Sequence, residues 1–176
     1  TITGKFEDEN PFDIAINFGK NTKKTIKKNG KLFKRILDHI GQIQTVFITP
    51  NDIALIYEGS EERRKFIDFT ICQLDTTYLK NLVEYRKVIE QRNSLLKTGE
   101  GRFVDEILLE SYNHKLIPLN HKIYETRKKF LAEFIPHFNK TYSDLSGSSE
   151  KCDIHYKSCL NDHTMTSIFE SNYRID

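Results

Sequence analysis

Two long stretches of helical periodicity, with a very short break between them, constrain the fold of this chain most strongly. Apolar side chains recur at helical spacing in residues 75–97, and a second helical stretch begins near Phe103. The break between them is Thr98-Gly99-Glu100-Gly101. Because so short a turn joins two helices only when they run antiparallel, the pattern predicts a helical hairpin, about 30 Å long for about 20 residues in each helix.

The second helical stretch contains two prolines. Its apolar side chains repeat about every four residues, at Leu119, Ile123, Phe130, Phe134 and Phe138. Pro118 and Pro136 lie inside this pattern, and a proline removes a backbone donor and clashes with the preceding turn. We therefore expect kinks or short breaks at both prolines, and a polar loop at residues 143–149.

The first third of the chain has the pattern of β structure. Ile14, Ile16 and Phe18 alternate with other residues, and Asn29-Gly30 is a strong signal for a two-residue hairpin. Residues 1–33 are therefore expected to form an antiparallel meander. The elements expected next are a short helix at 34–40, a buried strand at Thr45–Ile48 and a short helix that reaches Tyr57.

The remaining signals place strands on both sides of the helices. Ser60 and Asp75 suit the N-caps of two successive helices. Alternation at Asp153–Lys157 predicts a return strand, and residues 163–173 predict a last short helix. The fold class is therefore α+β: an antiparallel meander with an inserted helical hairpin. The expected parts are a β-rich lobe at 1–58, a helical arm at 59–147 and a returning segment at 148–176.

Composition excludes several classes of protein. With 38% hydrophobic and 11% aromatic residues, the 176-residue chain is too apolar to be disordered, and no stretch approaches the roughly 20 apolar residues that cross a bilayer. Three cysteines without regular spacing do not indicate a disulfide framework. We expect a soluble, cytoplasmic protein with reduced thiols. Because the chain begins at Thr1 with a strand-like segment already under way, we also expect it to be an internal segment of a larger protein.

A block of positive charge lies within the predicted meander. No acidic residue occurs from Ile14 to Leu37, and a localised basic block indicates a site for a polyanion such as nucleic acid. The alternative is a solvated, lysine-rich hairpin, since lysine also protects the edges of sheets. The cations of the block are Lys20, Lys23, Lys24, Lys27, Lys28, Lys31, Lys34 and Arg35.

No motif of a catalytic or metal site is present. The sequence has neither G-x-x-x-x-G-K-[ST] nor G-x-G-x-x-G, so we expect this segment alone neither to bind a triphosphate in the usual manner nor to hydrolyse ATP. Cys152, His155, Cys159 and His163 do not follow a standard zinc spacing. Cys72 has no obvious base nearby in sequence, so a self-contained enzyme has no support.

An unusual cluster of charge opens the helix that follows Gly59. Arg63, Arg64 and Lys65 are consecutive cations near its start, where the helix dipole disfavours positive charge. We therefore expect another interaction to hold them, with a carboxylate, a phosphate or a partner chain.

Several segments in combination resemble the RecF family, recombination-repair ATPases related to the SMC and Rad50 proteins. Phe47–Asp52 looks like the family's F-[ST]-P-E-D segment, and Glu58–Asp68 looks like its G-S-x-x-x-R-R-x-F-[LI]-D signature. Asn51 departs from the usual Glu, and Phe103 lies where Trp is common. Further similar segments are Asn29-Gly30-Lys31, Gln91–Lys97 (Q-R-N-x-L-L-K), Arg127–Phe130 and Tyr142–Tyr156.

The resemblance implies the outer part of the first lobe of an ABC-type ATPase head, together with the helical arm inserted into it. ATP and magnesium would be cofactors of the full-length protein, held by motifs outside this segment, with none for this chain alone. The implied partners are double-stranded or gapped DNA, RecO and RecR, and a second copy of the protein in an ATP-dependent dimer. No membrane is implied as a partner. The implied role is to help load recombinase in DNA replication, repair, recombination and the SOS response.

The resemblance also implies roles for particular residues. The lysine block would contact DNA phosphates, and Asn51 and Asp52 occupy the place of a Q-loop that senses nucleotide. The alternative is an arm for protein interaction or dimerisation that makes no DNA contact of its own. The residues expected to form a structural or dimer signature are Arg63, Arg64, Asp68, Gln91, Arg92 and Asn93.

Overall fold

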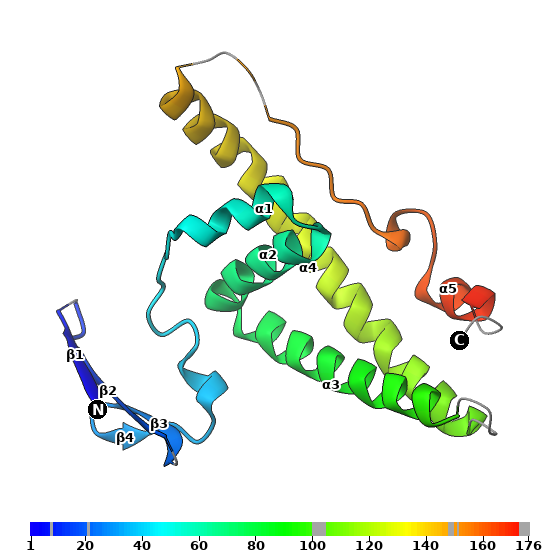
Figure 1. Ribbon diagram of the computed structural model, residues 1–176, viewed down its shortest axis with the longest axis horizontal. Helices are drawn as coiled ribbons and strands as arrows, with labels where there is room; N and C mark the ends of the chain where they lie inside the picture. Colours follow the sequence, from blue (N-terminus) through cyan, green and yellow to red (C-terminus); the bar gives the residue numbers. More distant parts are fainter. Residues whose placement is uncertain (8, 21, 100–104, 148–149, 151, 173–176) are drawn as a thin grey trace.

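A small antiparallel sheet and a group of long helices make up the chain (Figure 1). The computed structural model describes residues 1–7, 9–20, 22–99, 105–147, 150 and 152–172. The strands follow one another in the sheet in chain order, which confirms the meander. They are β1 (Ile2–Phe6), β2 (Phe12–Gly19), β3 (Thr22–Lys28) and β4 (Lys31–Leu32).

The pairing register gives the sheet an apolar face and a polar face. Ile16 lies opposite Ile2 on one side and Ile26 on the other, so these three side chains share a face. The turn between β3 and β4 contains Asn29 at φ 50° and Gly30 at φ 76°. These angles are those of a type I′ hairpin, as the Asn-Gly pair predicts.

A connecting segment passes from the sheet to the helices. It contains the 3₁₀ helices η1 (Ile36–His39) and η2 (Pro50–Ile53) and the short helix α1 (Ala54–Tyr57). Gly41, at φ 82°, lies so close to α2 that a Cβ there would be 2.7 Å from the carbonyl oxygen of Gln73. Only glycine fits this approach, which brings the segment against the helices.

Two long helices, α3 (Thr76–Gly99) and α4 (Glu106–Ser146), form the predicted antiparallel hairpin. The shorter helix α2 (Ser60–Leu74) precedes the hairpin, and α5 (Met165–Asn172) follows it. Asp75 accepts hydrogen bonds from the amides of Thr77 (2.7 Å) and Tyr78 (3.0 Å), which confirms its capping role at α3. The expected start of the second helix near Phe103 lies outside the described residues.

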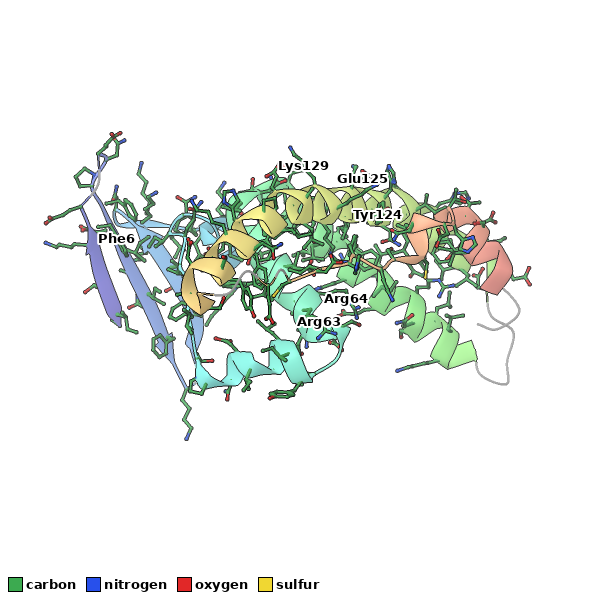
Figure 2. The ribbon with its side chains drawn as sticks, turned by 90° about the horizontal axis from the view of Figure 1, so that it is seen from above. Phe6, Arg63, Arg64, Tyr124, Glu125 and Lys129 are labelled. Atoms are coloured by element: carbon green, nitrogen blue, oxygen red, sulfur yellow. The ribbon has the colours of Figure 1, made fainter. Side chains whose placement is uncertain are left out.

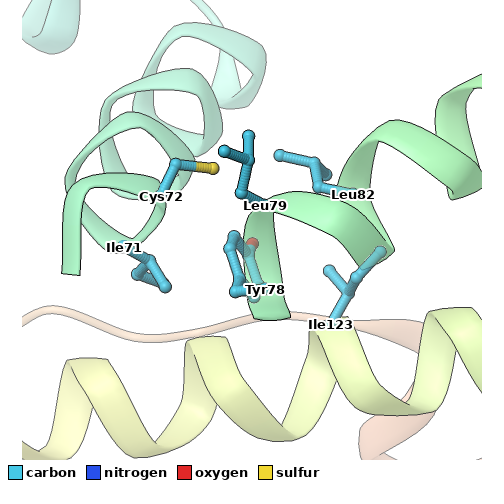
Figure 3. Close-up of a cluster of buried hydrophobic side chains, with 6 residues drawn as sticks. All are labelled: Ile71, Cys72, Tyr78, Leu79, Leu82 and Ile123. Carbon is cyan, nitrogen blue, oxygen red and sulfur yellow. The ribbon is translucent and has the colours of Figure 1, made fainter. Parts of the chain in front are cut away.

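Two apolar clusters hold the helices together. Figure 3 shows the first cluster at the junction of α2, α3 and α4, with Leu37 and Ile40 of the connecting segment packed against it. Its buried members are Ile71, Cys72, Tyr78, Leu79, Leu82 and Ile123. The second cluster lies farther along the hairpin and is made of Val88, Leu116 and Leu119, with Phe169 of α5 against it.

Three local predictions about the helices are wrong: a break at the prolines, a loop from residue 143, and Ser60 as an N-cap. α4 continues as one helix through Pro118 and Pro136, both of which are exposed, so neither proline interrupts it, and the expected kinks stay a prediction. α4 also extends to Ser146, into the expected polar loop, and ends at Gly147 with φ 63°. The N-cap of α2 is Gly59, and Ser60 is already the first helical residue.

Two predicted strands are absent from the described part of the chain. Residues 45–48 have no regular structure, and Val46 and Ile48 are 88% and 89% exposed. Residues 153–157 likewise run without strand pairing, alongside α4 (Figure 1). Both segments have strand-like sequence patterns, but the four-stranded sheet does not extend to either of them.

Candidate functional site

The basic block lies on β3, β4 and their flanking turns. Lys27 lies opposite Ala15 and Leu32, whereas Lys28 lies opposite Ile14 and Lys31. Because neighbouring residues of a strand point to opposite faces, the block is divided between the two faces of the sheet. The exposed members are Lys20, Lys23, Lys24, Lys27, Lys31, Lys34 and Arg35.

Two cations of the block have partners within the chain. The ammonium of Lys28 lies 4.4 Å from the centre of the Phe12 ring and donates to Oε1 of Gln42 at 2.8 Å. Arg35 forms an ion pair of 2.7 Å with Asp38, and its hydrogen bond lowers the pKa of that carboxyl. Lys28 and Arg35 therefore contribute to local structure, and the six exposed lysines make up the available positive surface.

Asn51 and Asp52 lie in η2 and are both exposed. Oδ2 of Asp52 accepts a hydrogen bond of 2.6 Å from the amide of Thr49 and so caps this short helix. Both residues come shortly after the exposed apolar segment 46–48 in the sequence.

The three cations at the start of α2 are held in three different ways. Arg63 donates to the carbonyl oxygens of Leu55 (2.9 Å) and Glu58 (3.0 Å), so it satisfies acceptors at the end of α1. Arg64 donates to Oγ of Ser60 at 2.8 Å. Lys65 pairs with Glu61 and Glu62 at 3.0 and 2.7 Å. Figure 2 shows Arg63 and Arg64 next to each other near the corner between α1 and α2.

Asp68 lies at the centre of a buried polar group that joins α2, α3 and α4. Its two carboxylate oxygens accept hydrogen bonds from Nε and an Nη of Arg127, both at 2.8 Å. The hydroxyl of Tyr78 donates to the same carboxylate at 2.6 Å. We call Asp68, Tyr78 and Arg127 the buried triad.

Burial and charge act on the ionisable groups around the triad. Burial raises the pKa of Tyr78, and its hydrogen bond to Asp68 raises it further. Burial alone would lower the pKa of Arg127, but the hydrogen bond and charge of Asp68 outweigh it and raise this pKa. Burial also raises the pKa of the neighbouring Cys72 thiol to about 11, so this thiol stays protonated at neutral pH.

Sequence reasoning included Asp68 in the signature but did not select Tyr78 or Arg127 as site residues. A usable signal was present, because Arg127 interrupts an apolar stripe between Ile123 and Phe130. A cation on the packed face of a helix needs a buried counter-charge. Beside the triad, a groove of about 390 Å³ is lined by Arg64, Arg86 and Tyr85, among others.

The other signature residues lie elsewhere on the hairpin. Arg92 is buried, donates to Oδ1 of Asn113 at 2.9 Å and lies 5.3 Å from the centre of the Phe169 ring. It therefore connects α3 with α4 and α5. Gln91 and Asn93 are exposed. The structure thus does not bring the signature residues of α2 and those of α3 into one site.

Within the described ranges, no three His, Cys, Asp or Glu side chains are grouped so that they could hold a metal ion. In those same ranges, no helix is long and apolar enough to span a membrane.

Comparison with known proteins identifies relatives along nearly the whole chain. No family model matches it. The DNA replication and repair protein RecF of Flavobacterium johnsoniae is 43% identical over 164 residues, which are 93% of this chain and 46% of that protein. RecF of Cytophaga hutchinsonii is 36% identical over 172 residues, which are 97% of this chain and 45% of that protein. The chain thus spans about half the length of the curated relatives that it matches.

Solved structures agree with the sequence relatives. A structure described as the recombination mediator protein RecF-ATPrS in the RecFOR pathway has a TM-score of 0.79 and 30% identity, over 94% of this chain and 45% of that one. A second, of RecF-ATP in the same pathway, has a TM-score of 0.77 and 27% identity, over 93% and 46%. Sequence and fold therefore agree over the same span, and the chain belongs to the RecF family.

Proposed function

We propose that this chain provides a DNA-binding lobe surface and the helical arm of a RecF-like recombination-repair protein. In this proposal the full-length protein binds double-stranded or gapped DNA as an ATP-dependent dimer and helps RecO and RecR to load recombinase. The proposed DNA contact is inferred from six exposed lysines around β3 and β4, which lie in a stretch without acidic residues. Such charges bind phosphates without reading sequence.

We further propose that the three parts of the chain divide this work. Residues 1–58 would supply the basic lobe surface, residues 59–147 the arm, and residues 148–176 the return toward the head. The related structures described as RecF-ATP and RecF-ATPrS support ATP as a ligand of the full-length protein.

The proposed DNA contact is tested by replacing Lys23, Lys24 and Lys27 with Gln in the full-length protein. Binding to a gapped duplex is measured from about 50 to 200 mM salt, and removing one phosphate contact should reduce the slope of log K against log salt by about 0.9. Lys80→Gln combined with Lys87→Gln, two exposed sites on α3, is the control. An unchanged slope would contradict a DNA contact by the lobe.

The second candidate function is an arm for protein interaction or dimerisation. Lys31 on the edge strand β4 favours it, because lysine at a sheet edge also acts to prevent pairing with other chains. Under this alternative, the wild-type protein would bind gapped duplex weakly, and its binding would not depend steeply on salt.

Asn51 and Asp52 are proposed to communicate the nucleotide state to the arm. In the full-length protein we expect Asp52→Ala to weaken ATP-dependent dimerisation, measured by sedimentation with and without ATP. Asp52→Asn tests the cap separately, because an amide oxygen can still accept the Thr49 hydrogen bond without the negative charge. Unchanged dimerisation in both variants would remove Asp52 from this role.

A further inference from the structure

α4 has two covered faces in this structure. Leu116, Leu119 and Ile123 are buried against α3. On another side, the Tyr124 ring stacks on that of Tyr156, with centres 5.7 Å apart, and so holds the segment that follows α4. These contacts leave a third face of α4 open to solvent.

Lysines follow one another along this third face. Lys115, Lys122 and Lys129 are exposed and spaced by seven residues, which is two helical turns or about 10.5 Å. Within the described residues, none of the three forms an ion pair. A parallel row, shifted by one residue, consists of His114, His121 and Lys128.

Acidic residues are scarce along the same part of α4. From residue 111 to residue 132, Glu125 is the only acid in the sequence. Figure 2 shows Glu125 and Lys129 on the outer side of α4. Arg127 faces inward, where it pairs with Asp68, so it adds no charge to the outer face. Glu133 is exposed one turn beyond Lys129 on the same side. The outer face therefore has four lysines and two glutamates, a net charge of about +2 when the histidines are neutral.

The chemistry of this face fits a phosphate backbone better than a protein. The large exposed apolar side chains of α4 are Ile107, Leu108 and Leu145, all near its ends, so the lysine face has no apolar anchor. Protein interfaces are enriched in aromatic residues and Arg and depleted in Lys. Lysine acts as a flexible point charge, which suits contacts with phosphates that do not depend on base sequence.

The spacing of the lysines also fits a duplex. Successive lysines are about 10.5 Å apart, close to the width of about 12 Å of the major groove of B-DNA. A helix that lies across this groove therefore places neighbouring lysines near phosphates on its two edges. The three lysines together span about 21 Å.

We propose, on the basis of the DNA binding proposed above, that the α4 lysine face (Lys115, Lys122, Lys128 and Lys129) is a second contact surface for the backbone of duplex DNA. It lies on the arm and is separate from the lysines of the sheet. The arm thus binds DNA directly, in addition to any role in dimerisation.

The test uses the full-length protein and a gapped duplex over a series of salt concentrations. Replacing Lys115, Lys122 and Lys129 with Gln should weaken binding and reduce the salt slope by about 0.9 for each phosphate that is no longer neutralised, or about 2.7 for all three. The matched control replaces Lys80, Lys87 and Lys97, which are exposed lysines of α3. It should leave the slope near that of the wild type.

A substitution that should strengthen DNA binding distinguishes an effect of charge from damage to the fold. Glu125→Gln removes an acid from the lysine face and should tighten binding and steepen the slope, which damage to the fold would not do. If the variant of Lys115, Lys122 and Lys129 has the slope of the control, the α4 contact is overturned. The proposed function still stands in that case, provided that replacing Lys23, Lys24 and Lys27 in the sheet flattens the slope. If the wild type fails to bind gapped duplex at any salt concentration, the proposed function and the α4 contact are both overturned.

Discussion

Asp68 lies where α2, α3 and α4 meet, and its environment explains why the signature segment contains an acid at this position. A buried carboxylate is costly unless it is paired and hydrogen-bonded. Here Arg127 supplies the charge and Tyr78 an additional donor. The buried triad therefore fixes how α2 packs on the hairpin.

We expect Asp68→Asn to reduce the free energy of unfolding by about 3–5 kcal/mol, because it leaves the largely buried Arg127 guanidinium without its close counter-charge. Urea denaturation followed by circular dichroism measures this change. Glu110→Gln, in an exposed pair with His114, is the control and should leave the midpoint close to that of the wild type. A decrease of less than about 1 kcal/mol for Asp68→Asn would show that the triad does not hold the helices together.

At the residue scale, the sequence predicted that the cations at the start of α2 need partners, but not which partners. Lys65 finds carboxylates on its own helix, as spacing alone suggests. Arg63 instead reaches the carbonyls of Leu55 and Glu58. This contact depends on the turn between α1 and α2, and no side-chain pattern in the sequence specifies it.

At the scale of elements, the prolines of α4 show how tertiary contacts override a local rule. Pro118 and Pro136 remove the hydrogen bonds to the carbonyls of His114 and Ala132, yet the helix continues. Both prolines are on the exposed side, where water can solvate the freed carbonyls. The residues around them stay packed against α3 and the returning segment.

We therefore expect Pro118→Ala to increase the free energy of unfolding by up to about 3 kcal/mol, the difference between Pro and Ala in a helix interior. Urea denaturation gives the value. Pro50→Ala is the control, because Pro50 occupies the first position of η2, where proline is favourable. An unchanged or lower stability for Pro118→Ala would show that the ring of Pro118 does not destabilise α4.

Element prediction succeeded where the signal was local and failed where it depended on a distant partner. The Asn29-Gly30 hairpin and the cap at Asp75 are decided by a few neighbouring residues. The patterns at 45–48 and 153–157 are typical of strands, but a strand needs a neighbour to pair with. The described part of the chain offers neither segment such a neighbour.

At the scale of the whole molecule, few contacts join the sheet to the helices. Leu37 and Ile40 pack on the first apolar cluster, Lys28 donates to Gln42, and the amide of Thr45 donates to Oε1 of Gln73 at 2.8 Å. Between these contacts and η2, residues 46–48 are exposed and apolar. Exposed apolar segments of this kind indicate an interaction site.

We expect chymotrypsin to cut the 176-residue chain first after Phe47, since this exposed segment has no regular structure to protect it. Mass spectrometry of early fragments identifies the cut, and Phe47→Ala should slow it. In the full-length protein we expect protection at Phe47, because further chain would cover residues 46–48. Equal rates of cleavage in the two proteins would show that these residues stay exposed.

The unbroken length of α4 has a mechanical consequence. Its 41 residues make a rod of about 60 Å, of which α3 braces only a part. A stiff rod turns as one body, so a tilt of about 5° at one end of a helix this long displaces the other end by about 5 Å. Small rearrangements near one end of α4 are thereby amplified into movements at the other end as large as a helical turn.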